Sequence, residues 1–147
     1  MVDQFIEGNF LGLPDVDGDA DVIIAPIPYE LTTSYGQGTA EGPAACIAAS
    51  GQVELFDHKL GQELPAGKKI RTVQPWSGEG NTLQEQLNGI GEYAAEQYNS
   101  GAFPIFRGGE HGILPGILRG CPKKVTLVQI DAHADLRDEL DLSLIHI

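Results

Sequence analysis

Short apolar runs alternate along the chain with stretches in which apolar residues recur at helical spacing. The clearest runs occupy residues 21–26, 103–106 and 125–130, and weaker ones occupy residues 53–56 and 69–73. Near-continuous apolar runs of this length are typical of strands that are covered on both faces, as in a parallel sheet. The alternation therefore predicts βαβ units and an α/β fold.

Three helices are expected between these strands. One covers residues 42–50, the longest covers residues 82–99 with Asn81 as its cap, and a short one covers residues 113–118, with Pro115 in its first turn. Apolar residues of the long helix recur at three- and four-residue steps, so it should pack one stripe on the sheet. That stripe consists of Leu83, Leu87, Ile90 and Ala94.

The composition is that of one globular domain. The 147 residues are 41% apolar, and a chain of this length can bury roughly 70% of its unfolded surface. It therefore needs neither a disulfide nor a metal ion to hold a core together. Cys46 and Cys121 lie 75 positions apart (121 minus 46) and form no C-x-x-C motif, so we expect both to be reduced thiols.

Charge and the N-terminal sequence narrow the partners and the location. The chain has 21 acidic and 9 basic side chains, a net charge of −12. Nucleic-acid binding needs clustered Lys and Arg, so we expect no nucleic-acid partner. No apolar run approaches the roughly 18 residues that cross a bilayer, and no basic region followed by an apolar stretch begins the chain. We therefore expect a cytoplasmic protein without a membrane partner.

Side chains that commonly bind metals follow two of the predicted strands. Asp131, His133 and Asp135 occupy alternate positions directly after residues 125–130, and His111 follows the strand at residues 103–106. In open α/β sheets, ligands bind outside the carboxyl ends of the strands. If the backbone stays extended, alternate side chains share one face, about 7 Å apart at their Cα atoms. Carboxylates and imidazoles without a thiolate suit Mn²⁺.

Alone, the Asp131–His133–Asp135 motif is as consistent with a solvated loop or a helix start as with a metal site, and Gly-Gly-Glu-His at residues 108–111 is more typical of a turn. Their placement after strands of one sheet favours metal binding. His58 has no such context and is expected at the surface. The glycine run over residues 36–42 has neither the dinucleotide-binding nor the phosphate-loop spacing. We interpret it as a substrate-cleft loop or a structural turn.

Two of these segments resemble a known family. Residues 108–111, Gly-Gly-Glu-His, and residues 131–138, Asp-Ala-His-Ala-Asp-Leu-Arg-Asp, are similar to the first two metal-binding signatures of the ureohydrolases, the arginase and agmatinase family. Residues 28–43 also resemble that family and are closest to agmatinase. The resemblance implies a three-layer αβα fold with a mainly parallel sheet. Residues 1–138 would form the N-terminal half of such a domain, and residues 139–147 match no family motif.

The resemblance also implies a mechanism and a ligand set. In the family, two Mn²⁺ ions activate a bridging hydroxide that attacks a guanidinium carbon and releases urea. His111 and Asp135 would bind one ion, His133 the other, and Asp131 both; Asp135 would also relay a proton to the leaving amine. The leading substrate is agmatine, which yields putrescine for polyamine biosynthesis, followed by guanidinobutyrate and arginine. A complete enzyme is expected to be a homo-oligomer.

A second hypothesis is a truncated, non-catalytic metal-binding fragment. The family's S-x-D-x-D-x-x-D-P signature supplies two further carboxylates, and this sequence does not contain it. Two Mn²⁺ ions carry four positive charges, whereas Asp131, Asp135 and a hydroxide supply only three negative ones. The chain alone is therefore expected to bind Mn²⁺ weakly and to turn over little substrate.

Overall fold

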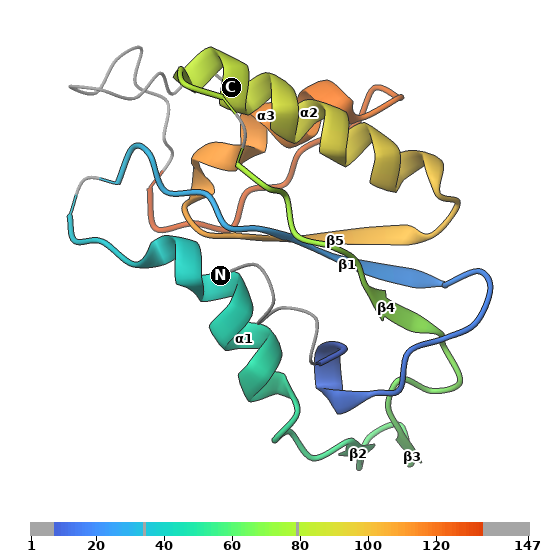
Figure 1. Cartoon of the computed structure of the whole chain (residues 1–147). Coiled ribbons are helices and arrows are strands. Elements are labelled where there is room, and N and C mark those ends of the chain that lie inside the picture. Colours follow the sequence, from blue (N-terminus) through green and yellow to red (C-terminus); the bar gives the residue numbers. More distant parts are fainter. Residues whose placement is uncertain (1–7, 34, 79, 134–147) are drawn as a thin grey trace.

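Three parallel strands form the central sheet, in the order β4, β1, β5 (Figure 1). The computed structural model describes residues 8–33, 35–78 and 80–133. Strand β1 (Val22–Ile27) lies in the middle, β4 (Ile70–Thr72) pairs along one edge and β5 (Phe103–Gly108) along the other. The strands predicted at residues 21–26, 69–73 and 103–106 are confirmed.

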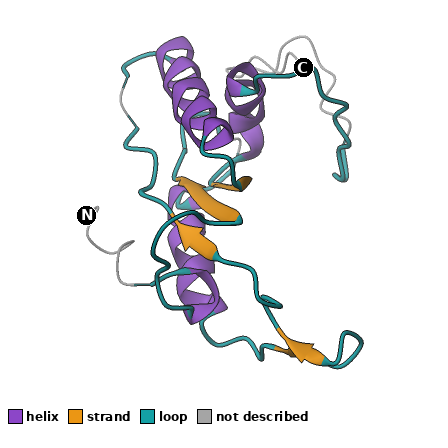
Figure 2. Cartoon of the chain, turned by 90° about the vertical axis from the view of Figure 1, so that its right-hand side faces the viewer, coloured by secondary structure: helices purple, strands orange, loops and turns teal. Residues whose placement is uncertain are grey.

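Helices cover both faces of this sheet. Helix α1 (Gly42–Ser50) lies on one side, and α2 (Leu83–Asn99) and α3 (Leu114–Gly120) lie together on the other (Figures 1 and 2). The predicted three-layer αβα fold is thus confirmed, and each predicted helix is present within about two residues of its expected bounds. None of the helices in the described part of the chain is long and apolar enough to span a membrane.

Short 3-10 helices lead into two of these helices. Residues Thr39–Glu41 (η3) precede α1, and His111–Ile113 (η4) precede α3. A third 3-10 turn, η2 (Phe10–Gly12), packs beside α1 and β4. Leu11 N donates a 2.8 Å hydrogen bond to Ser50 Oγ, which connects η2 to the end of α1.

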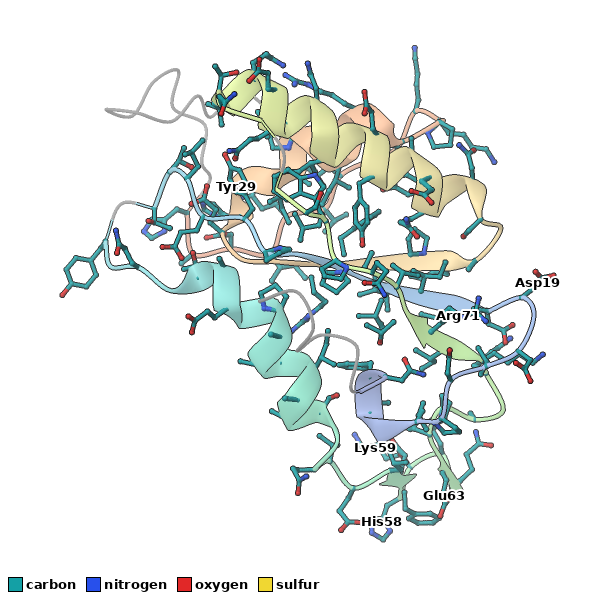
Figure 3. The ribbon with its side chains drawn as sticks, in the orientation of Figure 1. Asp19, Tyr29, His58, Lys59, Glu63 and Arg71 are labelled. Carbon is teal, nitrogen blue, oxygen red and sulfur yellow. The ribbon has the colours of Figure 1, made fainter. Side chains whose placement is uncertain are left out.

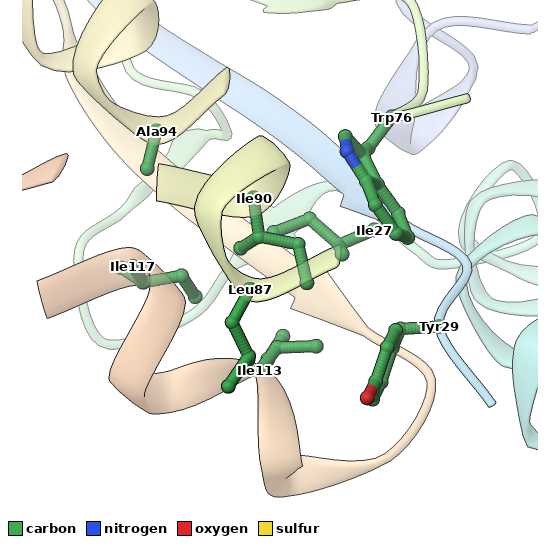
Figure 4. Close-up of a cluster of buried hydrophobic side chains, with 8 residues drawn as sticks. All are labelled: Ile27, Tyr29, Trp76, Leu87, Ile90, Ala94, Ile113 and Ile117. Atoms are coloured by element: carbon green, nitrogen blue, oxygen red, sulfur yellow. The ribbon is translucent and has the colours of Figure 1, made fainter. Parts of the chain in front are cut away.

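The main core lies between the sheet and the α2–α3 pair (Figure 4). Helix α2 contributes Leu87, Ile90 and Ala94, which are 6%, 0% and 0% exposed, so the predicted stripe faces inward. Helices α2 and α3 approach closely because Gly120 has no side chain. A Cβ atom at this position would overlap the carbonyl oxygen of Gly91. The buried cluster consists of Ile27, Tyr29, Trp76, Leu87, Ile90, Ala94, Ile113 and Ile117.

The cap of α2 is Thr82, and the prediction of Asn81 was wrong. Thr82 Oγ1 accepts a 3.2 Å hydrogen bond from Glu85 N, and the Glu85 carboxylate accepts hydrogen bonds from the amides of Asn81 and Thr82 at 2.9 and 3.1 Å. These amides, that of Asn81 most, hold the pKa of Glu85 below its ordinary value. The two residues form a reciprocal capping box, which the Asn81 side chain does not join.

The strand predicted at residues 53–56 is largely absent. Strand β2 (Phe56–Asp57) instead pairs antiparallel with β3 (Gln62–Glu63) in a small hairpin set apart from the main sheet (Figure 2). The Asp57 carboxylate accepts hydrogen bonds from the amides of Lys59 and Leu60 at 2.8 and 2.9 Å. At the start of the predicted strand, Gln52 N and Val53 N still donate to Ala49 O and Ser50 O at 3.0 and 3.3 Å, so the chain is still turning out of α1 at residue 53.

The strand predicted at residues 125–130 is also wrong. These residues follow α3 as an irregular segment, and no other described segment pairs with them. Val128 and Ile130 are 78% and 97% exposed. A strand needs a neighbour for its N–H and C=O groups, so an apolar sequence without a partner stays irregular.

The loop after β5 packs directly against the loop after β1. Gly109 N donates to Ile27 O at 3.0 Å, and Glu110 N donates to Tyr29 O at 3.1 Å. A Cβ atom on Gly109 would overlap the Tyr29 carbonyl oxygen and lie 2.9 Å from that of Thr39. Only glycine permits this approach, which determines where residues 110–112 lie.

Replacement of Thr82 by Ala should lower the free energy of unfolding by about 1 kcal/mol, because Glu85 N loses its acceptor. Asn81→Ala is the matched control, since only the backbone amide of Asn81 takes part in the cap. It should change stability by less than about 0.5 kcal/mol. Urea denaturation followed by circular dichroism measures both, and a larger loss for Asn81→Ala would contradict the assigned cap.

Gly109→Ala should lower the free energy of unfolding by about 1–3 kcal/mol, because the new methyl group must displace packed backbone. Gly42→Ala is the control. Gly42 begins α1, and the heavy atom nearest to a Cβ added there would be Gly108 O, at 4.0 Å. Its stability should be unchanged or increase by up to about 1 kcal/mol. Equal stability of the two variants in urea denaturation would argue against the close approach.

Candidate metal centre

The first predicted metal-binding motif, residues 108–111, lies in the loop after β5, beside the carboxyl end of β1. Strand β5 ends at Gly108, Gly109 and Glu110 turn against the β1 loop, and His111 begins η4. The sequence prediction placed His111 at a strand end, and the structure confirms this position.

Asp131 connects His111 to His133. Asp131 Oδ2 lies 3.6 Å from Nδ1 of His111, and Asp131 Oδ1 lies 4.0 Å from Nδ1 of His133. The imidazoles are exposed, whereas the Asp131 side chain is 32% exposed. One carboxylate therefore faces an imidazole from each of the two sequence motifs, although the motifs are 20 residues apart (131 minus 111).

A bend, not an extended backbone, arranges the second motif. His133 N donates a 3.0 Å hydrogen bond to Asp131 Oδ1, and Gln129 Nε2 donates to His133 O at 3.2 Å. Residues 131–133 form a bend, so the condition of an extended backbone, under which alternate side chains share one face, is not met. The His133 amide, followed by the imidazoles of His111 and His133, holds the pKa of Asp131 below its ordinary value, so the carboxylate is ionised at neutral pH.

The donor types at Asp131, His111 and His133 fit Mn²⁺. Carboxylate oxygens and imidazole nitrogens are suitable Mn²⁺ ligands. Within residues 8–33, 35–78 and 80–133, no three His, Cys, Asp or Glu side chains form one metal-binding group. Asp135, predicted both as a ligand and as the catalytic carboxylate, lies outside the described residues. The His111–Asp131 and His133–Asp131 pairs are therefore the described part of this candidate centre.

Two carboxylates that sequence reasoning did not assign hold the surrounding loops. Both oxygens of Glu110 accept hydrogen bonds from Thr32 N, at 3.2 and 3.1 Å, and Thr32 Oγ1 donates to Glu110 Oε1 at 2.5 Å. Glu30 accepts from Gly38 N at 2.7 Å and from Ala40 N at 3.0 Å. Glu110 thus joins the β1 loop to the β5 loop, and Glu30 closes the β1 loop on itself.

Glu30 explains the glycine run. Its carboxylate also accepts a 3.0 Å hydrogen bond from Thr39 Oγ1, and these donors, led by the Ala40 amide, hold the pKa of Glu30 below its ordinary value. The run therefore includes a structural turn around a carboxylate. The usable sequence signal was Glu30 itself, eight residues before Gly38, a glycine with a φ of 108°.

Tyr29 is a further polar residue that the sequence did not reveal. It is 2% exposed, and its hydroxyl is the buried side-chain polar atom that has no hydrogen-bond partner among the described residues. Burial, with the nearby Glu110 carboxylate as a second cause, raises the pKa of Tyr29 to about 12. The phenol is therefore neutral throughout the physiological range.

His58 and the cysteines lie outside this centre. His58 is exposed on the β2–β3 hairpin, edge-on to Phe56 with 5.1 Å between ring centroids, and Figure 3 shows it at the opposite end of the molecule from Tyr29. The surface position predicted for His58 is confirmed. Cys46 and Cys121 are both free thiols, as expected. His146 lies outside the described residues.

Comparison with known proteins places the whole arrangement in one family. The family model described as "Arginase family" matches residues 20–146. N(1)-aminopropylagmatine ureohydrolase of Synechocystis sp. is 36% identical over 135 residues, which cover 84% of this chain and 43% of that protein. Agmatinase of Bacillus anthracis is 31% identical over 126 residues, again 84% of this chain and 43% of that protein. The chain thus spans under half the length of these curated relatives.

A solved structure agrees with the fold. The crystal structure of Trypanosoma cruzi formiminoglutamase with Mn²⁺ matches this chain with a TM-score of 0.72 at 23% sequence identity. The match covers 94% of this chain and 49% of that one. With its αβα layers, its ligand motif after β5 and a family match over most of its length, this chain belongs to the arginase family.

Proposed function

We propose that this chain carries part of the active centre of an Mn²⁺-dependent hydrolase of guanidino compounds, with agmatine or an aminopropyl derivative of agmatine as the substrate. The observation that carries the proposal is the Asp131 carboxylate, whose two oxygens face His111 and His133. Bridging carboxylates with one imidazole on each side are suited to holding two ions close together.

The relatives support the type of reaction. The Synechocystis and B. anthracis proteins are named for ureohydrolase and agmatinase activities, and the T. cruzi structure contains Mn²⁺. The net charge of −12 is in accord with a cationic substrate, because a negative surface attracts a guanidinium ion.

Each residue of the centre has a distinct task in this proposal. A divalent metal ion in such a site lowers the pKa of water towards 7 and so supplies a nucleophile at neutral pH. His111 and His133 would each hold one ion, and Asp131, ionised and fixed by the His133 amide, would hold both. Asp135 would have the role that its motif implies, as a ligand that passes a proton to the leaving amine. A carboxylate next to the nucleophile is suited to that transfer.

The 147-residue chain by itself should release little or no urea from agmatine in Mn²⁺, because it supplies too few carboxylates for two ions. Fusion to the C-terminal half of the Synechocystis relative should restore release, and Asp131→Ala or His133→Ala should abolish it again. A colorimetric urea assay on mass-verified protein measures this. Rapid turnover by the unfused chain would contradict the proposal that the C-terminal half must supply further metal ligands.

The chain should bind Mn²⁺ weakly. Asp131→Asn should weaken binding at least about tenfold, because it removes the negative charge of the carboxylate that faces both His111 and His133. His58→Ala is the matched control, since it removes a distant exposed imidazole. It should leave the dissociation constant within about threefold of the parent value. Isothermal titration measures all three proteins, and an unchanged constant in Asp131→Asn would show that the metal binds elsewhere.

A further inference from the structure

We propose that Glu110 is a positioning residue: through Thr32 it sets the place from which His111 presents its imidazole to Mn²⁺. The inference rests on the proposed function, because it concerns the same metal centre. It assigns a task to a side chain that is adjacent to the ligand in sequence but is directed to a different loop.

The contacts of Glu110 are directed at one residue. Thr32 N donates to both carboxylate oxygens, at 3.2 and 3.1 Å, and Thr32 Oγ1 donates to Oε1 at 2.5 Å. Hydrogen bonds to an ionised acceptor are roughly twice as strong as neutral ones. Because both oxygens are already engaged by Thr32, Glu110 is better placed as a support than as a metal ligand.

His111 lies between a hydrogen-bonded residue, Glu110, and a glycine, Gly112, that packs close to the Glu110 carboxylate. On its N-terminal side, Glu110 N donates to Tyr29 O at 3.1 Å. On its C-terminal side, a Cβ atom on Gly112 would lie 3.1 Å from Glu110 Oε1 and 3.4 Å from Thr32 Oγ1. The Glu110 carboxylate therefore turns back over Gly112, and the Thr32 contact limits the backbone on both sides of His111.

Glu110 and Thr32 form a hydrogen-bonded pair next to the candidate ligand His111, where they can fix the backbone that carries it. Residues around a metal site that orient its ligands contribute to binding, and their loss typically costs about 10- to 100-fold in metal affinity or activity. Glu30 offers a contrast within the same loop, because its hydrogen bonds attach residues 38–40 and do not involve Thr32 or Glu110.

The test uses Glu110→Gln, Thr32→Val and their double variant in the 147-residue chain, with Glu30→Gln as the matched control. Isothermal titration should show Mn²⁺ affinity lowered at least about tenfold in each single variant. The Mn²⁺ affinity of the double variant should be no more than about threefold below that of the weaker-binding single variant, because both substitutions break the same Glu110–Thr32 contact. Glu30→Gln should stay within about threefold of the parent.

A second measurement needs no metal. Amide hydrogen exchange of metal-free protein should be at least about tenfold faster at Gly109 and Glu110 in Glu110→Gln and in Thr32→Val, but unchanged there in Glu30→Gln. Thermal melts of all variants show whether the chain remains folded, and Thr32→Val, which keeps the Thr32 amide donor, is the milder change.

His111→Ala separates the two hypotheses. If His111→Ala abolishes Mn²⁺ binding while Glu110→Gln leaves it within threefold, Glu110 is not a positioning residue and the proposed function stands. If neither His111→Ala nor Asp131→Asn alters binding, or the parent chain binds no Mn²⁺, the proposed metal centre is wrong and the inference fails with it. A loss in Glu110→Gln that Thr32→Val does not share, or that Glu30→Gln reproduces, also overturns the inference.

Discussion

The approach of two backbone segments, the loops after β1 and β5, determines where the candidate ligand His111 lies. Gly109 lies directly against the carbonyl groups of Tyr29 and Thr39, and its amide donates to Ile27 O. His111 begins η4 two residues later and faces Asp131. A side chain at position 109 would separate the loops, so one missing Cβ atom supports the geometry of the whole edge.

The hydrophobic core continues into this polar edge. Tyr29 and Ile113, which flank the two loops in the sequence, are 2% and 6% exposed and belong to the same cluster as Ile90 of α2. The loops are therefore attached to the α2–α3 layer by apolar contacts and to each other by hydrogen bonds. This combination gives a rigid base to side chains that are themselves exposed.

Local patterns predicted most of the fold but not the contacts between loops. The apolar run of β1 and the apolar stripe of α2 were sufficient to predict these two elements and their buried faces, because burial repeats with the period of the element. The cap at Thr82 was missed since Asn81 and Thr82 are both good caps and only the geometry chooses between them. Residues 125–130 were mistaken for a strand because apolar content does not reveal a missing neighbour. The pairing of Glu110 with Thr32 spans 78 positions, and no local spacing encodes it.

The central place of β1 has a consequence during synthesis. Val22 pairs with Ile70 on one side and with Phe103 on the other, so the partners of the middle strand are made 48 and 81 residues later (70 minus 22 and 103 minus 22). At about 5–20 residues per second, the second partner leaves the ribosome roughly 4–16 s after β1. During that interval β1, whose last five residues are buried in the folded domain, has at least one edge unpaired. The nascent chain thus holds an apolar strand with an incomplete set of partners for several seconds.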